Sequence, residues 1–143
     1  MIEKIRNYFR ENGIIDKECR INVDFLGEEP TEFALEPIPV NPILDKYVNG
    51  DTLRQFQFQF LSCSEYGADV MQNIENSTFY ENLYELIEYN NKHKILPDIN
   101  GIDTIECLNN GAILNAGTNT ARYSIQMRIT YYEEAKWSKL NLR

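Results

Sequence analysis

Residues 52–62, TLRQFQFQFLS, alternate strictly between two kinds of side chain. Phe56, Phe58 and Phe60 occupy every second position, and glutamines stand between them. Because successive side chains of a β-strand point to opposite faces of a sheet, the pattern predicts a strand with one aromatic and one amide face. The aromatic face has to be buried, so the rest of the chain must supply a layer that covers it.

A second long stretch, residues 120–132 (TARYSIQMRITYY), has the same period. Its apolar positions are Tyr123, Ile125, Met127, Ile129 and Tyr131. We expect the two stretches to form the centre of one sheet, with their apolar faces towards the core and their polar faces outwards.

The polar positions of both stretches supply candidate contact residues. They are Arg54, Gln55, Gln57, Gln59, Arg122, Gln126 and Arg128. Such a surface is typical of the solvated face of an antiparallel sheet, but a subunit contact or the lining of a channel also fits. The residues alone leave both interpretations open.

The first half of the chain predicts one helix and several short strands. Ile2, Ile5 and Phe9 recur at helical spacing, which predicts a helix over residues 2–11. Strands are expected at 20–26 and 31–35, followed by an extended connector because residues 37, 39 and 42 are prolines. Asn49-Gly50 predicts a tight hairpin turn between residues 43–48 and the strand that begins at residue 52.

The second half predicts helix followed by sheet. Residues 68–91 have a helical pattern that Asn76-Ser77-Thr78 is expected to divide into two helices, the second of which covers the phenylalanines. Strands at 104–108, 112–116 and 120–132 are expected to form an antiparallel meander. The predicted fold class is α/β (α+β): a single domain over 1–143 with a mainly antiparallel sheet, helices packed on one face and a C-terminal tail over 133–143.

Composition narrows the function classes. With 143 residues and a net charge of −8, the chain is a poor candidate for tight binding to nucleic acid, which requires Lys and Arg against phosphates. The odd number and wide spacing of Cys19, Cys63 and Cys107 favour free thiols in a reducing cytosol over disulfides or a zinc site. No signal peptide and no membrane-spanning run is recognised.

Catalytic motifs are absent from the sequence. The one histidine, His93, lies between two lysines at an expected helix end, and no glycine-rich phosphate loop or metal-ligand motif occurs. We therefore expect no enzymatic activity, no cofactor and no metal.

Several segments together, in this order, carry a family resemblance. They are RINVDFLG at 20–27, EPTEFALEPIP at 29–39, GDTLRQFQFQF at 50–60, YGADVMQNIENSTFYENLYELIE at 66–88 and TARYSIQMRITYY at 120–132. The chain resembles the small tail-terminator (neck) proteins of phages and prophages of Gram-positive bacteria. These proteins are often labelled minor capsid protein or chloramphenicol resistance protein. The resemblance extends over nearly the whole chain to about residue 132.

The resemblance implies a structural role. Such proteins form a ring, usually hexameric, that caps the head-proximal end of a tail tube, stops tube growth and joins the tail to the head or neck. A related collar ring closes headless contractile bacteriocins. Implied partners are further copies of the chain, tail tube and sheath proteins, and a head connector. The implied location is the bacterial host cytoplasm during assembly and then the virion or phage-tail-like particle.

Two alternatives are kept beside that role. A head-to-tail connector bound to another ring fits the same segments, and the resistance label suggests a small acyltransferase-type enzyme.

For the C-terminal tail, Trp137 is a further candidate for the subunit interface because buried aromatic side chains often anchor protein contacts. A tail without fixed structure is the alternative expectation for terminal residues.

Overall fold

The computed structural model describes residues 1–12, 21–23, 32–65, 70–116 and 120–135. Two helices and seven strands lie in this part of the chain. They are α1 (Ile2–Glu11), β1 (Ile21–Val23), β2 (Glu32–Ile38), β3 (Ile43–Lys46), β4 (Thr52–Glu65), α2 (Val70–Lys92), β5 (Ile102–Cys107), β6 (Ala112–Ala116) and β7 (Thr120–Glu133). The Ile2–Glu11 helix agrees with the sequence prediction.

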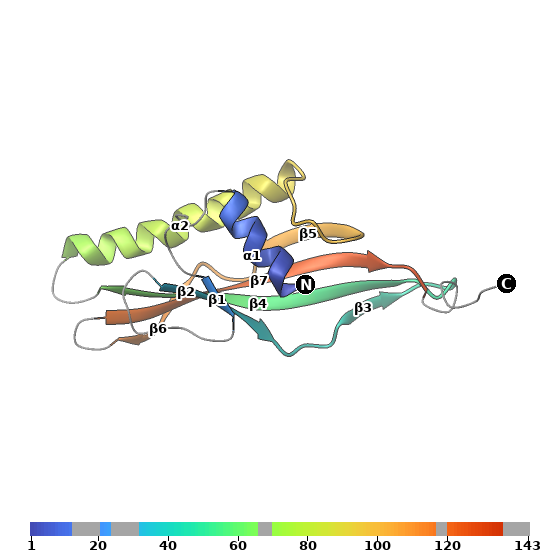
Figure 1. Ribbon diagram of the computed structural model, residues 1–143, viewed down its shortest axis with the longest axis horizontal. Helices are drawn as coiled ribbons and strands as arrows, with labels where there is room; N and C mark the ends of the chain where they lie inside the picture. The colour runs from blue at the N-terminus through green and yellow to red at the C-terminus, as the bar shows by residue number, and fades with distance from the viewer. Residues whose placement is uncertain (13–20, 24–31, 66–69, 117–119, 136–143) are drawn as a thin grey trace.

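The two long strands β4 and β7 form the centre of one sheet, as their alternation predicts. They pair antiparallel over their full 14 residues, from Thr52 opposite Glu133 to Glu65 opposite Thr120. Both helices lie on the same side of this ribbon (Figure 1). The predicted α+β fold, a mainly antiparallel sheet with helices on one face, is therefore confirmed.

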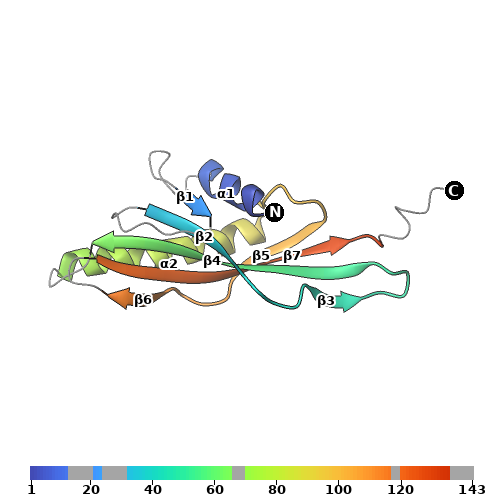
Figure 2. The same ribbon diagram turned by 60° about the horizontal axis from the view of Figure 1, so that its bottom comes forward.

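Shorter strands line the two outer edges of the ribbon. β2 and β3 follow one another along the free edge of β4, and β5 and β6 follow one another along β7. β1 then adds a parallel strand outside β2. Figure 2 shows β6 and β3 towards opposite ends of the ribbon. The predicted meander is wrong in one respect, because β5 and β6 both pair with β7 and lie end to end.

The proline-rich segment differs in part from its prediction. β2 continues through Pro37, which lies opposite Phe58, whereas a proline was expected to end the strand. The reason is that β1 pairs only with Phe33 to Leu35, so β2 is an edge strand at Pro37, and edge strands tolerate proline. The connector follows the edge as expected, since Gln55 N donates to Pro42 O at 2.8 Å.

Helix α2 is continuous over 23 residues, so the predicted interruption at residues 76–78 is wrong. Asn, Ser and Thr cost only a few tenths of a kcal/mol each in a helix interior. Burial of Tyr80, Leu83 and Ile87 against the sheet outweighs that penalty.

The core lies between the helices and the aromatic face of β4. Phe58 and Phe60 are fully buried, while Phe56 is only partly buried at the margin of the cluster. The ring of Phe9 on α1 lies 6.2 Å from Phe58 and 5.3 Å from Phe60. Phe79 on α2 lies 6.3 Å from Phe60. Both helices therefore cover the phenylalanines, whereas the sequence assigned that role to the second helix alone.

The helices are shorter than the ribbon that they cover. At one end β3, β4 and β7 extend beyond α1 (Figure 1). There β3 and β4 form the predicted hairpin, with Gly50 at a φ of 91° and a bond from Gly50 N to Tyr47 O of 3.0 Å. This end of the ribbon has exposed surface on both of its faces.

Candidate interaction surface

Five predicted contact residues lie together on the sheet face that points away from the helices. In the β4–β7 register Gln57 is opposite Arg128 and Gln59 is opposite Gln126, with Gln55 in the next row. Directly opposed residues share a face, so the sequence assignment is confirmed for these five. We call Gln55, Gln57, Gln59, Gln126 and Arg128 the amide patch. Its side chains are exposed or partly exposed.

Hydrogen bonds fix the side chains of the amide patch across the sheet. Gln59 Nε2 donates to Glu36 Oε2 on β2 at 3.3 Å, and Arg128 Nε donates to Glu106 Oε1 on β5 at 2.7 Å. Gln57 Nε2 donates to Gln55 Oε1 at 3.0 Å. Because these side chains are already ordered, a partner that binds them loses less conformational entropy than it would on a mobile surface.

The amide patch ends sharply along the ribbon. The next row on the same face consists of Ala34, Leu61 and Ser124, all of which are buried. At the other end the following row pairs Leu53 with Tyr132, whose ring lies 5.8 Å from that of Tyr47. The prediction of an unbroken polar face is therefore too broad, because three polar rows lie between the row of Leu61 and the row of Leu53.

Arg54 does not belong to the amide patch. It is opposite Tyr131, on the face of the phenylalanines, and its Nε lies 2.9 Å from Glu133 Oε2. The prediction that grouped it with the glutamines is wrong because position 54 has the same parity as Phe56. A charged residue can occupy this face because the guanidinium remains partly exposed and is paired with Glu133.

Two further predicted residues have limited structural support. Arg122 is on β7, opposite Cys63 of β4, so its position in the strand corresponds to the face of the amide patch. Its side chain is outside the described part of the structure. Trp137 lies outside the described residues altogether.

Cys107, one of the three predicted free thiols, is half-buried and free, and burial is the chief cause that raises its pKa to about 12.

Asp51 fixes the tip of the β3–β4 hairpin, and the sequence had identified it only as a turn residue. Its Oδ1 accepts a hydrogen bond from Ala135 N at 2.7 Å, and its Oδ2 accepts one from Asn49 Nδ2 at 2.9 Å. The hydroxyl of Tyr132 donates to the same carboxylate. These hydrogen bonds join the hairpin to the end of β7. Val48, at the tip of the hairpin, is fully exposed.

These donors lower the pKa of Asp51, with Tyr132 as the largest cause and Ala135 N next. A lowered folded pKa means that the contribution to stability is present above the unfolded value of 3.8 and is lost as pH falls through the folded value. We expect the Ala135 amide resonance to titrate with a midpoint below 3.8 in an NMR pH series, and Asp51→Asn to abolish that titration. A midpoint at or above the unfolded value would show that the joint does not form.

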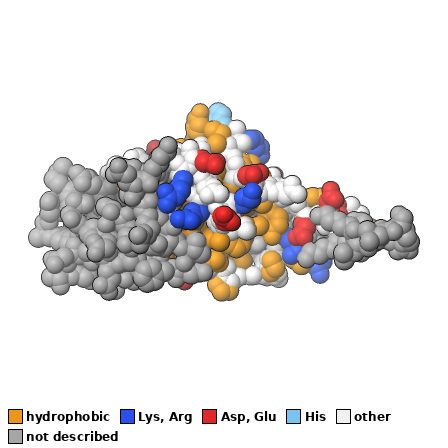
Figure 3. Space-filling model, in the orientation of Figure 1, with side chains coloured by type: hydrophobic (Ala, Val, Ile, Leu, Met, Phe, Trp, Pro, Cys, Tyr) orange, Lys and Arg blue, Asp and Glu red, His pale blue; other side chains and the backbone are white. Residues whose placement is uncertain are grey.

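The helix side of the molecule is charged differently from the amide patch. Glu81, Glu85 and Glu88 are exposed along one side of α2. Over the middle of the view in Figure 3, the coloured Lys and Arg side chains alternate with Asp and Glu, and the described residues on the face in view form no continuous basic surface. His93 is exposed, and its ring lies 4.2 Å from that of Tyr89.

The described residues contain neither a group of metal-ligating side chains nor a helix suited to a membrane. No three His, Cys, Asp or Glu side chains among them are grouped as metal ligands. Neither described helix has the length and apolar character needed to cross a bilayer.

No family model matches this chain, and no curated protein matches it. The interpretation of the surface consequently depends on the residues and their geometry.

Proposed function

We propose that the chain is a structural subunit of a closed hexameric ring that caps the head-proximal end of a phage or phage-like tail tube. The ring stops tube growth and joins the tail to a head, or closes a headless contractile bacteriocin. Assembly in the bacterial host cytoplasm precedes incorporation into the particle. The family resemblance of the segments quoted above supports this role, and the observation that carries it is the ordered, exposed amide patch.

The shape of the subunit suits a ring. A ring requires two different surfaces on each subunit, because each copy contacts its neighbours head to tail. The amide patch is one such surface, and the end of the ribbon that extends beyond the helices is a second. The sheet between them is a single hydrogen-bonded body, which keeps the two surfaces at a fixed angle. A fixed angle between contacts is what closes a ring at one size.

The charge of the subunit suits a ring through which DNA passes. Each subunit has a net charge of −8, so a ring of subunits has a strongly negative potential. Such a ring does not bind a polyanion tightly as it passes through. The acidic side of α2 is a suitable surface to face such a passage. We expect no nanomolar, salt-sensitive binding to random duplex DNA.

The test combines electron microscopy with a charge change in the amide patch. Gln57→Glu adds a carboxylate directly opposite Arg128, which already pairs with Glu106, and it removes the donor to Gln55 Oε1. We expect a folded subunit by circular dichroism that needs roughly tenfold more protein to form rings, since the change adds negative charge to the contact and alters the side chains that a neighbour meets. Asn82→Asp, the same change on the exposed side of α2, is the matched control for added charge.

The outcomes separate the alternatives. Wild-type protein that forms rings, alone or on tubes, with Gln57→Glu impaired more than Asn82→Asp, supports the proposal. A wild type that stays monomeric but binds a preformed neck ring favours the connector role. An unfolded Gln57→Glu variant contradicts the assignment of Gln57 to the open face.

A further inference from the structure

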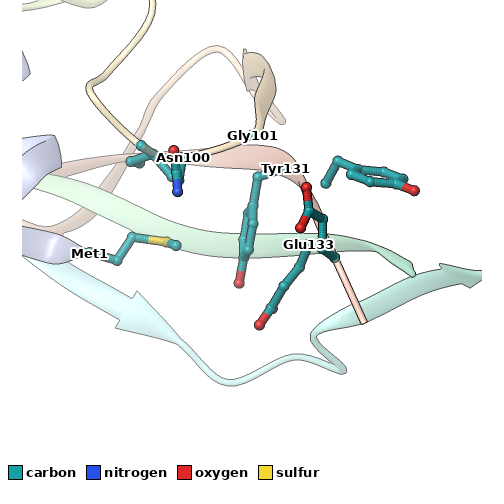
Figure 4. Close-up of a pocket in the computed structure, with 8 residues that line it drawn as sticks. Met1, Asn100, Gly101, Tyr131 and Glu133 are labelled. Carbon is teal, nitrogen blue, oxygen red and sulfur yellow. The ribbon is translucent and has the colours of Figure 1, made fainter. Parts of the chain in front are cut away.

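A hollow of about 520 Å³ opens where the ribbon extends beyond the helices. Its walls come from the start of α1, the loop before β5 and the end of β7. Figure 4 shows the Met1 side chain extending towards Tyr131, with Asn100 and Gly101 nearby. The hollow lies on the helix side of the sheet and is therefore distinct from the amide patch.

The walls combine an apolar surface with an acidic rim. Met1 is 42% exposed, and Ile99 and Tyr131 are partly exposed. Glu133 and Glu134 line the same hollow, and of the two only Glu133 has a described ion pair, with Arg54. An apolar wall beside carboxylates is complementary to a segment that carries both large apolar and basic side chains.

The chain itself contains such a segment directly after the described residues. Residues 136–143, KWSKLNLR, hold three basic side chains, two leucines and the only tryptophan of the protein. We infer that the hollow receives residues 136–143 of a second copy of the chain, with Trp137 against the apolar wall. This inference deepens the proposed ring function, on which it rests, by naming the surface that binds the neighbouring subunit.

The end of β7 favours a second copy over the same copy. β7 runs away from α1, and Ala135 is held by Asp51 at the far end of the hairpin (Figure 1). Trp137 follows Ala135 by two residue steps, which span at most about 7 Å. To place Trp137 in its own hollow, the segment has to reverse direction within that distance, and the hollow of a second copy is not subject to this constraint.

A mixing experiment tests the inference because Trp137 is the only tryptophan. The first variant, Ile99→Asp, has a damaged hollow and an intact segment. The second, Trp137→Ala, has an intact hollow and no tryptophan. Fluorescence of an equimolar mixture therefore reports only the Trp137 of the first variant. We expect that emission to lie at longer wavelength for the first variant alone and to shift to shorter wavelength on mixing.

Matched controls protect the result from misfolding. Ile95→Asp places the same change in the same loop, at an exposed position outside the hollow, and is expected to retain the short-wavelength emission of the wild type. Ile99 packs partly against the core, so Glu134→Lys at an exposed position is the second hollow variant. It is expected to weaken binding and to recover on mixing with Trp137→Ala in the same way.

Each other outcome overturns the inference. If mixing leaves the emission unchanged, the segment does not enter the hollow of another copy. If Ile99→Asp and Glu134→Lys both emit like the wild type, Trp137 binds elsewhere. Deletion of residues 136–143 separates this inference from the proposed function. Deletion is expected to leave a folded subunit that forms few rings, and a deletion variant with unchanged rings would refute the hollow contact alone.

Discussion

Replacement of Phe60 by alanine is expected to lower the free energy of unfolding by about 3–5 kcal/mol, the cost of removing a large aromatic side chain from a packed core. Phe60 is fully buried and has ring partners on three elements. They are Phe9 on α1 at 5.3 Å, Phe33 on β2 at 5.3 Å and Phe79 on α2 at 6.3 Å. The loss is a large part of the roughly 5–15 kcal/mol that stabilises a domain of ordinary size.

Urea unfolding followed by circular dichroism measures this loss, and Phe56→Ala is its matched control. Phe56 lies on the same strand and the same face but is only partly buried at the margin of the core. We therefore expect Phe56→Ala to cost less than half as much, since less buried surface and a smaller cavity are involved. Equal losses at the two positions would contradict the position of the helices over the ribbon.

Gly101→Ala is expected to destabilise the protein by on the order of 3 kcal/mol. Gly101 has a φ of +74°, and a Cβ there would stand 2.2 Å from Tyr132 O. Displacement of β7 would break hydrogen bonds, because Tyr132 N donates to Gly101 O at 2.8 Å and β7 is paired on both sides. Since Gly101 lines the hollow, the same change is expected to disturb the proposed contact with residues 136–143.

Gly50→Ala separates backbone strain from the steric clash at Gly101. Gly50 also has a positive φ, 91°, but it is exposed at the tip of the hairpin. We expect its replacement to cost only about 1 kcal/mol, the usual penalty of a left-handed conformation for alanine. Thermal unfolding of the two variants provides the comparison. A Gly101→Ala protein as stable as Gly50→Ala would show that β7 accommodates the methyl group.

Most of the amide patch could be predicted from the sequence, because it depends on the period of a strand. Gln57 and Gln126 alternate with apolar residues on strands that pair along their whole length, so their common face follows from local pattern. Arg54 could also have been placed correctly from its parity with Phe56. Its polar chemistry was given more weight than its position, and the structure shows that position decides the face.

The hollow could not be predicted from the sequence. The hollow exists because the ribbon extends beyond the start of α1 and the end of α2. How far the helices overlap the sheet depends on tertiary packing. Ile99 and Gly101 gave only the signal of a loop, and Tyr131 gave only the signal of an apolar strand position. Asp51 likewise read as a turn residue, because its bond to Ala135 N joins residues 84 apart in the chain.

The sequence by itself determined the elements that depend on local periodicity: helix Ile2–Glu11, the two long strands and the hairpin at Gly50. These depend on side-chain spacing and on glycine geometry, which are properties of neighbouring residues. Only the tertiary structure decided that β5 and β6 share one edge of β7, that α2 runs on through residues 76–78, and that the row of Leu61 and Ser124 is buried. Each of these depends on free energy from contacts between distant segments, which outweighs local preferences of a few tenths of a kcal/mol per residue.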